Sequence, residues 1–372
     1  MNELFGLTNL PYGVYSVGAA APRVATRYGD HVVDLASLLN DDVFAQPSLN
    51  PFMAQGPARW GEVRASITAA LADGLPTEGV HHVDAVELHL PFEVADYVDF
   101  YASEHHASNL GRLFRPDNPS PLLPNWKHLP VGYTGRASSV VVSGTDIVRP
   151  CGQHKPADAD APVFGPSTRL DIEAELGFVV GVGNARGRPI ATEDAERHLF
   201  GVVLFNDWSA RDLQAWEYVP LGPHLGKSFA STVSAWVVPM AALEAARVET
   251  PRQDPEPLGY LAMDPPWGLD IQLEVEWNNE VVSHPPYDSM YWSPAQMLAH
   301  LTVNGAPTRT GDLFASGTIS GAEPGQVGSF IERGQGFLAD GDEVVLHATA
   351  PGTGGTRIGF GECRGRITKA RS

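Results

Sequence analysis

Short β-branched runs separated by glycine and proline constrain the fold of this chain more than any other feature of its sequence. The 372 residues include 38 glycines and 31 prolines, which punctuate these runs. Such a pattern is typical of many short strands joined by turns and is not that of a helical bundle. The sequence therefore predicts a mixed, β-rich fold.

The N-terminal segment has the pattern of a small separate unit. YGVYSV, RVATRY and HVVDL are expected to form strands, and residues 59–74 one amphipathic helix. Pro91 follows the alternating segment HVDAVELHL and precedes a stretch crowded with Asp, Tyr, His and Arg, so we place a domain boundary near residue 90. Two domains, 1–90 and 91–372, also suit a chain that exceeds what one hydrophobic core usually serves.

The remaining elements are expected after this boundary. Strand patterns occur in SSVVVSG, LDIEAELGFVVGV, FGVVLFN, STVSAWVVP, LDIQLEVEW and DEVVLHA, and helical patterns near residues 102–114, 192–199, 208–217 and 293–302. The glycine-rich segments GVGNARG and GTGGTRIGFG match neither a dinucleotide fingerprint nor a P-loop, so we interpret them as turns. GxSxG is absent, which leaves a serine nucleophile without support.

Charge and cysteine content narrow the partners and the compartment. The formal net charge of −19 would repel a phosphate backbone, so no nucleic acid partner is expected. Cys151 and Cys363 stand far apart without metal-ligand spacing, which argues against a disulfide framework and favours a reducing compartment. With no basic leader and no stretch of about 18 apolar residues, the chain is expected to be soluble, cytoplasmic and free of the membrane.

Three carboxylates alternate with apolar residues in the segment LDIEAEL. Alternation places Asp171, Glu173 and Glu175 on one face of a strand. One interpretation is a solvated strand face, since charged faces are common in sheets. The other is a buried site, because the strand continues into an apolar run and buried carboxylates need a cation or hydrogen bonds.

Asp207 ends another apolar run and precedes a predicted helix. Arg211, Gln214 and Tyr218 are spaced i, i+3 and i+7, so they point the same way and suit an anionic group. The alternative is structural, with Asn206 or Asp207 serving as the N-cap of that helix.

The segment between Asp99 and Arg115 combines acidic, aromatic and histidine side chains. In a helix over residues 102–114, His106 lies on the stripe of Leu110 and faces inward. A buried histidine is often only a core residue with its hydrogen bonds satisfied. Nearby oxygen ligands favour the alternative, a base for metal-assisted hydrolysis.

Four carboxylates form a candidate metal site, namely Asp99, Glu173, Glu175 and Asp207. Their ligand atoms are all oxygens, which suits a hard divalent cation such as Ca²⁺ or Mg²⁺. Zinc, which structural and catalytic sites bind mostly through nitrogen and sulfur, is not expected.

Long motifs from about residue 97 to 365 resemble the fumarylacetoacetase family. They are DFYASEHHASN, LPNWKHLPVGYTGRASSVVVSGT, LDIEAELGFVVG, FGVVLFNDWSARDLQAWEYVPLGPHLGKSF, MYWSPAQMLAHLTVNG, GDLFASGTISGAEP and RIGFGECRG. The N-terminal unit is similar to the family more loosely, through LPYGVYS and GDHVVDL. The resemblance implies a small N-terminal SH3-like barrel, a large C-terminal mixed β-roll domain and a homodimer.

The implied activity is metal-dependent hydrolysis of a carbon–carbon bond in a small diketo acid. The family cleaves 4-fumarylacetoacetate to fumarate and acetoacetate, the last step of tyrosine and phenylalanine degradation. Two rivals stay open. Relatives of this fold decarboxylate, hydrate or isomerise keto acids or hydrolyse acylpyruvates, and fold alone does not exclude them. The second rival is a non-catalytic protein that only binds metal, and such a protein would need neither a base nor an oxyanion pocket.

The resemblance also assigns roles to individual residues. Metal ligands would be Asp99, Glu173, Glu175 and Asp207, with a second, smaller cation beside Asp207, Lys227 and Ser231, where the family has threonine in place of the serine. The general base would be His106, the carboxylate that orients it Glu332, and the oxyanion pocket Arg211, Gln214 and Lys227. Substrate contacts would come from Tyr101, Arg115, Tyr133, Gln214, Tyr218 and Thr318.

Overall fold

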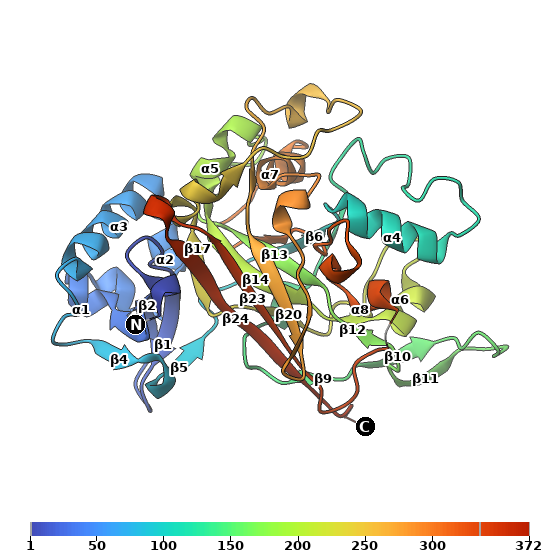
Figure 1. The fold of residues 1–372 in the computed structure, drawn as a ribbon, viewed down its shortest axis with the longest axis horizontal. Helices are drawn as coiled ribbons and strands as arrows, with labels where there is room; N and C mark the ends of the chain where they lie inside the picture. The colour runs from blue at the N-terminus through green and yellow to red at the C-terminus, as the bar shows by residue number, and fades with distance from the viewer. Residues whose placement is uncertain (1, 335, 372) are drawn as a thin grey trace.

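In a computed structural model of the protein, two β-sheets pack against each other at the centre of the molecule (Figure 1). The structure describes residues 2–334 and 336–371. The larger sheet has thirteen strands and the smaller sheet five. The predicted mixed, β-rich fold is therefore confirmed, and the helices lie around the outside of the sheets.

The larger sheet runs in the order β4 (Val80–His82), β3 (His31–Asp34), β2 (Arg23–Tyr28), β1 (Tyr12–Ser16), β17 (Trp236–Pro239), β14 (Leu199–Asp207), β13 (Ala174–Val180), β22 (Leu313–Ala315), β6 (Tyr97–Phe100) and β7 (Gly132–Thr134). Its side branches are β5 (Glu87–His89), β8 (Val140–Val142) and β16 (Ser231–Val233). The smaller sheet is β21 (Glu280–Ser283), β20 (Gln272–Trp277), β23 (Glu343–Pro351), β24 (Arg357–Thr368) and β9 (Ile147–Val148).

Three two-stranded pairs, eight α-helices and eleven short 3₁₀ helices complete the described chain. The pairs are β10 (Cys151–His154) with β11 (Val163–Pro166), β12 (Leu170–Asp171) with β15 (Ser209–Ala210), and β18 (Arg247–Val248) with β19 (Gly268–Leu269). The helices are α1 (Leu35–Leu39), α2 (Asn50–Met53), α3 (Pro57–Leu71), α4 (Glu104–Phe114), α5 (Ala195–His198), α6 (Arg211–Glu217), α7 (Pro294–Thr302) and α8 (Phe330–Arg333).

The N-terminal strands belong to the larger sheet. β1 pairs with β2 and β5, and it also pairs with β17, with Tyr12 opposite Val237. Among the described strands the sheet does not close into a barrel, because β4 ends the path with β3 as its neighbour. The chain segments before and after residue 90 thus share one sheet.

Strands β13 and β14 are buried on both faces, which explains their nearly continuous apolar sequences. Leu176 and Leu204 pack into the core between the two sheets. Val179 and Phe205 point to the opposite face, where they meet residues of the N-terminal strands and of α2 and α3. One pair of strands therefore contributes to the two largest hydrophobic cores.

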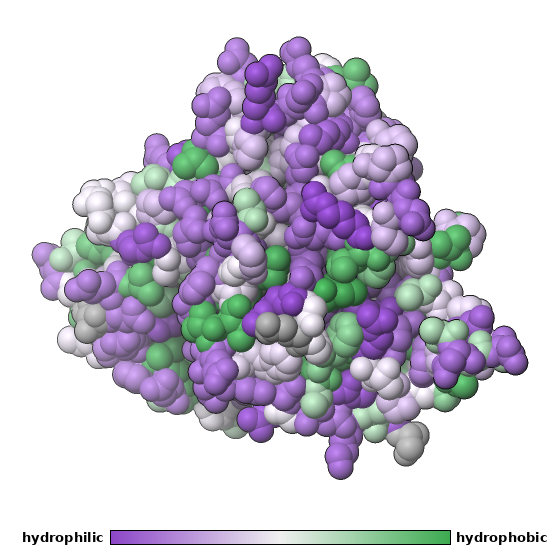
Figure 2. All heavy atoms as spheres, turned by 45° about the vertical axis from the view of Figure 1, so that its right-hand side comes forward, coloured by the Kyte–Doolittle hydropathy of each residue, from purple (hydrophilic) through white to green (hydrophobic). Residues whose placement is uncertain are grey.

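The molecular surface is largely polar. Figure 2 shows a face dominated by hydrophilic residues, on which apolar side chains gather in small separate groups. Within the described residues, no helix combines the length and the apolar composition needed to span a membrane.

Helix α4 is held against the neighbouring loop by a glycine. A Cβ atom on Gly111 would overlap the backbone carbonyl of Pro121, so only glycine fits this contact. We expect Gly111→Ala to lower the free energy of unfolding by about 1–3 kcal/mol through overpacking. The matched control is Gly61→Ala in α3, where a Cβ meets nothing within 4 Å and should stabilise by about 0.5–1 kcal/mol. Urea unfolding measures both, and equal effects would contradict the packing argument.

Candidate active site

Adjacent strands of the larger sheet bring three distant carboxylates together. Asp99 lies on β6, Asp207 ends β14, and Glu173 lies between β12 and β13, where its carbonyl accepts from Asp207 N at 3.1 Å. One oxygen from each of the three carboxylates lies within 4.8 Å of the others. The sheet order β14, β13, β22, β6 thus builds an acidic cluster from residues that are far apart in the sequence.

These carboxylates are buried. Asp171, Glu173 and Glu175 expose 0%, 6% and 0% of their surface, so the interpretation of LDIEAEL as a solvated strand face is wrong. Regular alternation also fails at this point, because β12 ends at Asp171 and β13 begins at Ala174. Asp171 accepts hydrogen bonds from Arg211 and from α8, away from the acidic cluster.

Two cations neutralise part of this charge. Lys227 Nζ contacts Glu173 and lies 2.9 Å from Asp207 Oδ2, and Arg211 Nη1 donates to Glu173 Oε1 at 2.8 Å. Burial raises the pKa of Glu173, but the charges of Lys227, Arg211 and His106 outweigh this effect and lower the pKa to about 2. Glu173 is therefore an ionised carboxylate held by two basic side chains.

Asp99 and Glu175 have fewer partners to compensate their buried charge. Asp99 Oδ1 and Glu175 Oε1 are buried and have no hydrogen-bond partner among the described residues. Burial, and then the charge of Asp207, raise the pKa of Asp99 well above its usual value, and burial and the charge of Asp99 do the same for Glu175. Buried oxygens without partners, next to further carboxylates, fit a hard divalent cation.

Glu175 lies beside this cluster, and the group of three does not include it. Its Oε2 accepts from Gly317 N at 2.9 Å, while Oε1 is the oxygen without a partner. Ser231 Oγ donates to Asp207 Oδ1 at 2.8 Å. The hydroxyl therefore lies next to the carboxylate with which it is expected to form the second cation site. A cavity of about 480 Å³ opens here, lined by Tyr133, Asp207, Lys227 and Ser231 among others.

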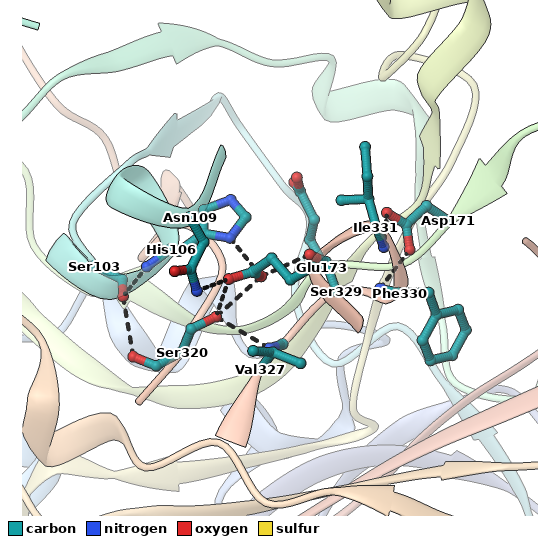
Figure 3. Close-up of polar contacts among 12 residues, drawn as sticks. Ser103, His106, Asn109, Asp171, Glu173, Ser320, Val327, Ser329, Phe330 and Ile331 are labelled. Atoms are coloured by element: carbon teal, nitrogen blue, oxygen red, sulfur yellow. Dashed lines mark hydrogen bonds and ion pairs between the residues drawn. The ribbon is translucent and has the colours of Figure 1, made fainter. Parts of the chain in front are cut away.

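A histidine and a glutamate meet next to the acidic cluster. His106 Nδ1 lies 2.7 Å from Glu332 Oε2, although the two residues are 226 positions apart (Figure 3). Because a carboxylate only accepts, the proton of this bond belongs to Nδ1, and Nε2 then carries the free lone pair of a base. The Tyr101 ring and the imidazole pack in a T-shaped arrangement, with ring centroids 5.3 Å apart.

Four donors fix the Glu332 carboxylate. Besides His106, they are Asn109 Nδ2 at 2.9 Å, Ser329 Oγ at 2.7 Å and Ser320 Oγ at 3.1 Å. Burial raises the pKa of Glu332, but the charge and hydrogen bond of His106 and the bonds from Asn109 and Ser329 lower it to about 2. Glu332 is thus ionised and held by four hydrogen-bond donors.

This lowered pKa predicts a pH-dependent stability. Since the folded pKa of about 2 lies below the ordinary 4.5, ionised Glu332 stabilises the fold above pH 4.5, and this contribution disappears as the pH falls toward 2. The full contribution is on the order of 3 kcal/mol. Urea unfolding of wild type and Glu332→Gln should therefore differ most at pH 6, and the difference should shrink as the pH falls from 4.5 toward 2. A difference that stays constant with pH would contradict this assignment.

The residues expected to contact a substrate have different surroundings. Tyr133 Oη donates to Asp207 Oδ2 at 2.9 Å, Gln214 Oε1 accepts from Arg211 Nη1 at 3.2 Å, and Thr318 is buried one residue beyond Gly317. Arg115 ends α4, and its Nε is buried without a partner among the described residues. Tyr218 lies at the end of α6 with 51% of its surface exposed, the most exposed of this group.

Helix α6 begins later than the sequence pattern indicates. The strand pairing continues through Asp207 and β15, and the N-cap of α6 is Ala210, without a side-chain capping bond. The N-cap interpretation of Asn206 and Asp207 is therefore wrong. Asn206 Oδ1 instead accepts from Glu173 N at 3.2 Å and so helps to hold the acidic segment.

Metal-assisted hydrolysis needs a group that can hold a cation and, beside it, a base that can activate water. The acidic cluster of the sheet and the His106–Glu332 pair of α4 and α8 are the candidates for these two groups, an arrangement that fits the class of metal-assisted hydrolases. Two family models match the chain: "Fumarylacetoacetase N-terminal" over residues 8–91 and "Fumarylacetoacetate (FAA) hydrolase C-terminal" over residues 96–368. The chain belongs to the fumarylacetoacetase family.

Similar proteins occur across distant organisms. Fumarylacetoacetase of Homo sapiens is 47% identical, with 98% of this chain and 96% of that protein covered, and the Caenorhabditis elegans protein is 46% identical, with 99% and 97% covered. Among solved structures, a fumarylacetoacetate hydrolase of Exiguobacterium antarcticum has a TM-score of 0.60 at 18% identity, covering 97% of this chain and 100% of that one. Maleylpyruvate hydrolase of Sphingobium sp. SYK-6, in complex with manganese and pyruvate, has a TM-score of 0.59 at 15% identity with the same coverage, so these two share the fold.

Proposed function

We propose that this protein is a fumarylacetoacetase, which hydrolyses 4-fumarylacetoacetate to fumarate and acetoacetate in the last step of tyrosine and phenylalanine degradation. Identity of 47% to the human protein, over nearly the full length of both chains, supports the substrate. The observation that carries the chemistry is the contact of His106 with ionised Glu332, beside the Arg211 and Lys227 pair.

The reaction follows from these positions. His106 Nε2 takes a proton from water, and the hydroxide attacks the ketone carbon that belongs to the fumaryl group and becomes a carboxyl carbon of fumarate. Negative charge develops on the ketone oxygen, where Arg211, Gln214 and Lys227 act as donors. Arg211 suits this role because its Nη2 is buried without a partner among the described residues.

The carbon–carbon bond then breaks and fumarate is released as a carboxylic acid. The electron pair of the broken bond passes to the methylene carbon of the acetoacetate half, where the adjacent carbonyl delocalises it. The proton held by His106 is transferred to this carbon, which completes acetoacetate and restores the neutral base. Water thus supplies the hydroxyl of one product and the hydrogen of the other.

Metal binding is assigned to Asp99, Glu173, Glu175 and Asp207, with Ca²⁺ as the main cation. When bound, the cation supplies Lewis-acid polarisation of the substrate carbonyl oxygens. Asp207, Lys227 and Ser231 are assigned to a second or substitute Mg²⁺. The donor chemistry supports both, since carboxylate and hydroxyl oxygens suit hard cations.

Substrate binding is assigned to Tyr101, Arg115, Tyr133, Gln214, Tyr218 and Thr318. Arg115 is the natural partner of a substrate carboxylate, because its Nε has no partner among the described residues.

The remaining features are part of the same proposal. They are an SH3-like N-terminal domain over residues 1–90, a catalytic β-roll domain over 91–372, a homodimer and a cytoplasmic location. Large apolar side chains that are exposed in the single chain, such as Phe164 and Leu221, support an interface between copies. Sedimentation of the purified protein measures the dimer directly.

Loss of diketone absorbance tests the reaction and its metal dependence together. We expect the purified protein to hydrolyse fumarylacetoacetate, to lose more than about 90% of its turnover after chelation, and to regain it with Ca²⁺ or Mg²⁺. The metal should also raise the melting temperature of wild type and should not do so for Asp99→Asn. Turnover of an acylpyruvate in place of fumarylacetoacetate, with metal stabilisation intact, would refute the substrate and leave the metal site standing.

A further inference from the structure

Asp171 occupies a position that no catalytic role yet explains. It lies at the end of β12, fully buried, two residues before Glu173. Its carboxylate points toward the N-terminal end of α8, where Figure 3 shows it beside Phe330 and Ile331. Both of its oxygens are used by groups from other parts of the chain.

The first of these groups is Arg211. Arg211 Nε donates to Asp171 Oδ2 at 2.8 Å, while Nη1 of the same guanidinium donates to Glu173. Two buried carboxylates therefore hold two of its nitrogens, and Nη2 is left without a partner among the described residues. Because a guanidinium is planar and rigid, fixing Nε and Nη1 also fixes the direction of Nη2.

The second group is the start of α8. Phe330 N donates to Asp171 Oδ1 at 2.8 Å, and Ile331 N donates to Oδ2 at 3.2 Å. The residue at the N-cap position, Ser329, makes no capping bond and uses its hydroxyl for Glu332 instead. A carboxylate from a distant strand thus caps the helix turn that carries Glu332.

We propose that Asp171 is a positioning residue that aligns the two halves of the catalytic site. On one side it directs Arg211 toward the developing oxyanion, and on the other it sets the turn from which Glu332 orients His106. This role rests on the proposed hydrolysis. No described hydrogen bond joins Arg211 directly to α8, whereas Asp171 accepts hydrogen bonds from both.

Kinetics of Asp171→Asn test this alignment. Asparagine keeps the size and one acceptor, but its amide group faces a donor on one of the two sides, so Arg211 or α8 must shift. We expect kcat to fall by about 10–100-fold, with KM within about threefold of wild type, since misalignment acts on the transition state. In a Glu332→Gln background the same substitution should lower kcat by a smaller factor than in wild type, because the pathway through α8 is already lost and only the one through Arg211 remains.

Asp212→Asn is the matched control. Asp212 follows Arg211 on α6 and accepts from Ser167 Oγ and from Thr168 N, but it contacts neither the guanidinium nor α8. We expect its kcat to stay within about threefold of wild type. Equal losses in both variants, or an undiminished loss in the Glu332→Gln background, would reduce Asp171 to an ordinary structural residue.

Hydrogen exchange tests the same idea without substrate. Asp171→Asn should speed amide exchange both in residues 329–334 and at the start of α6, whereas Asp212→Asn should leave 329–334 protected as in wild type. Unchanged exchange of 329–334 in Asp171→Asn would overturn the proposal. If wild type does not hydrolyse fumarylacetoacetate, the proposed function fails, and the exchange result still decides whether Asp171 supports both elements.

Discussion

Replacing His106 with alanine is expected to lower kcat for fumarylacetoacetate by about 10²–10⁴-fold, the usual contribution of a positioned general base. The imidazole is 1% exposed, is fixed by Glu332 through Nδ1, and presents Nε2 as its free acceptor. KM should change little, because the ring acts on water rather than on the substrate. Stopped assays of diketone absorbance under saturating metal measure both constants.

His105→Ala controls for damage to α4. His105 is the neighbouring residue on the same helix, only partly buried, and it belongs to no part of the site. Its kcat should remain within about threefold of wild type. If the two alanine variants lose activity equally, the assignment of His106 as the base fails, and a folded His106→Ala with full turnover would refute it outright.

Replacing Arg211 with methionine should damage both catalysis and folding. The guanidinium is the donor proposed for the oxyanion, and loss of one such donor costs about 10²–10³-fold in kcat. It also neutralises Asp171 and Glu173 in the interior, with ion-pair distances of 2.8 Å to each. Removing one partner of a buried pair costs about 3–5 kcal/mol of stability, because the remaining charges lose their compensation.

Arg197→Met is the surface control for this substitution. Arg197 pairs with Asp194 at 3.3 Å, but its side chain is 77% exposed, so water replaces the ion pair at little cost. We expect a stability change below about 0.5 kcal/mol and unchanged turnover. Chemical denaturation measures the stability of both variants, and kcat measures their catalysis. An Arg211→Met variant that is as stable as wild type but inactive would show that the arginine acts in catalysis and does not stabilise the fold.

The local pattern of the sequence predicts most of the secondary structure. Helix α3 was expected over 59–74 and spans Pro57–Leu71, and α7 was expected over 293–302 and spans Pro294–Thr302. Apolar periodicity and turn residues are local signals, so they determine elements of this kind well. The start of α6 was missed because the backbone pairing of Ser209 with Asp171 comes from a segment almost forty residues earlier.

The support around the site could not be predicted in the same way. Asn109, Ser320 and Ser329 converge on Glu332 from three segments, and a serine in a loop carries no signal of its partner. Asp171 looked like a strand-face carboxylate because alternation describes only one strand, whereas its burial depends on α6 and α8. Residue types in the motifs indicated the chemistry, and the tertiary contacts that hold them appear only in the fold.

The pairing of β1 with β17 sets an order on biosynthesis. Tyr12 leaves the ribosome early, but its partner Val237 follows only after more than half of the chain has been made. Until then Tyr12 and Gly13 have no partner on that edge of β1, which β5 pairs only from Val14 onward, and an unpaired edge is a site for wrong association. The nascent N-terminal strands must therefore wait, and slower translation between these two positions should lengthen the exposure of that edge.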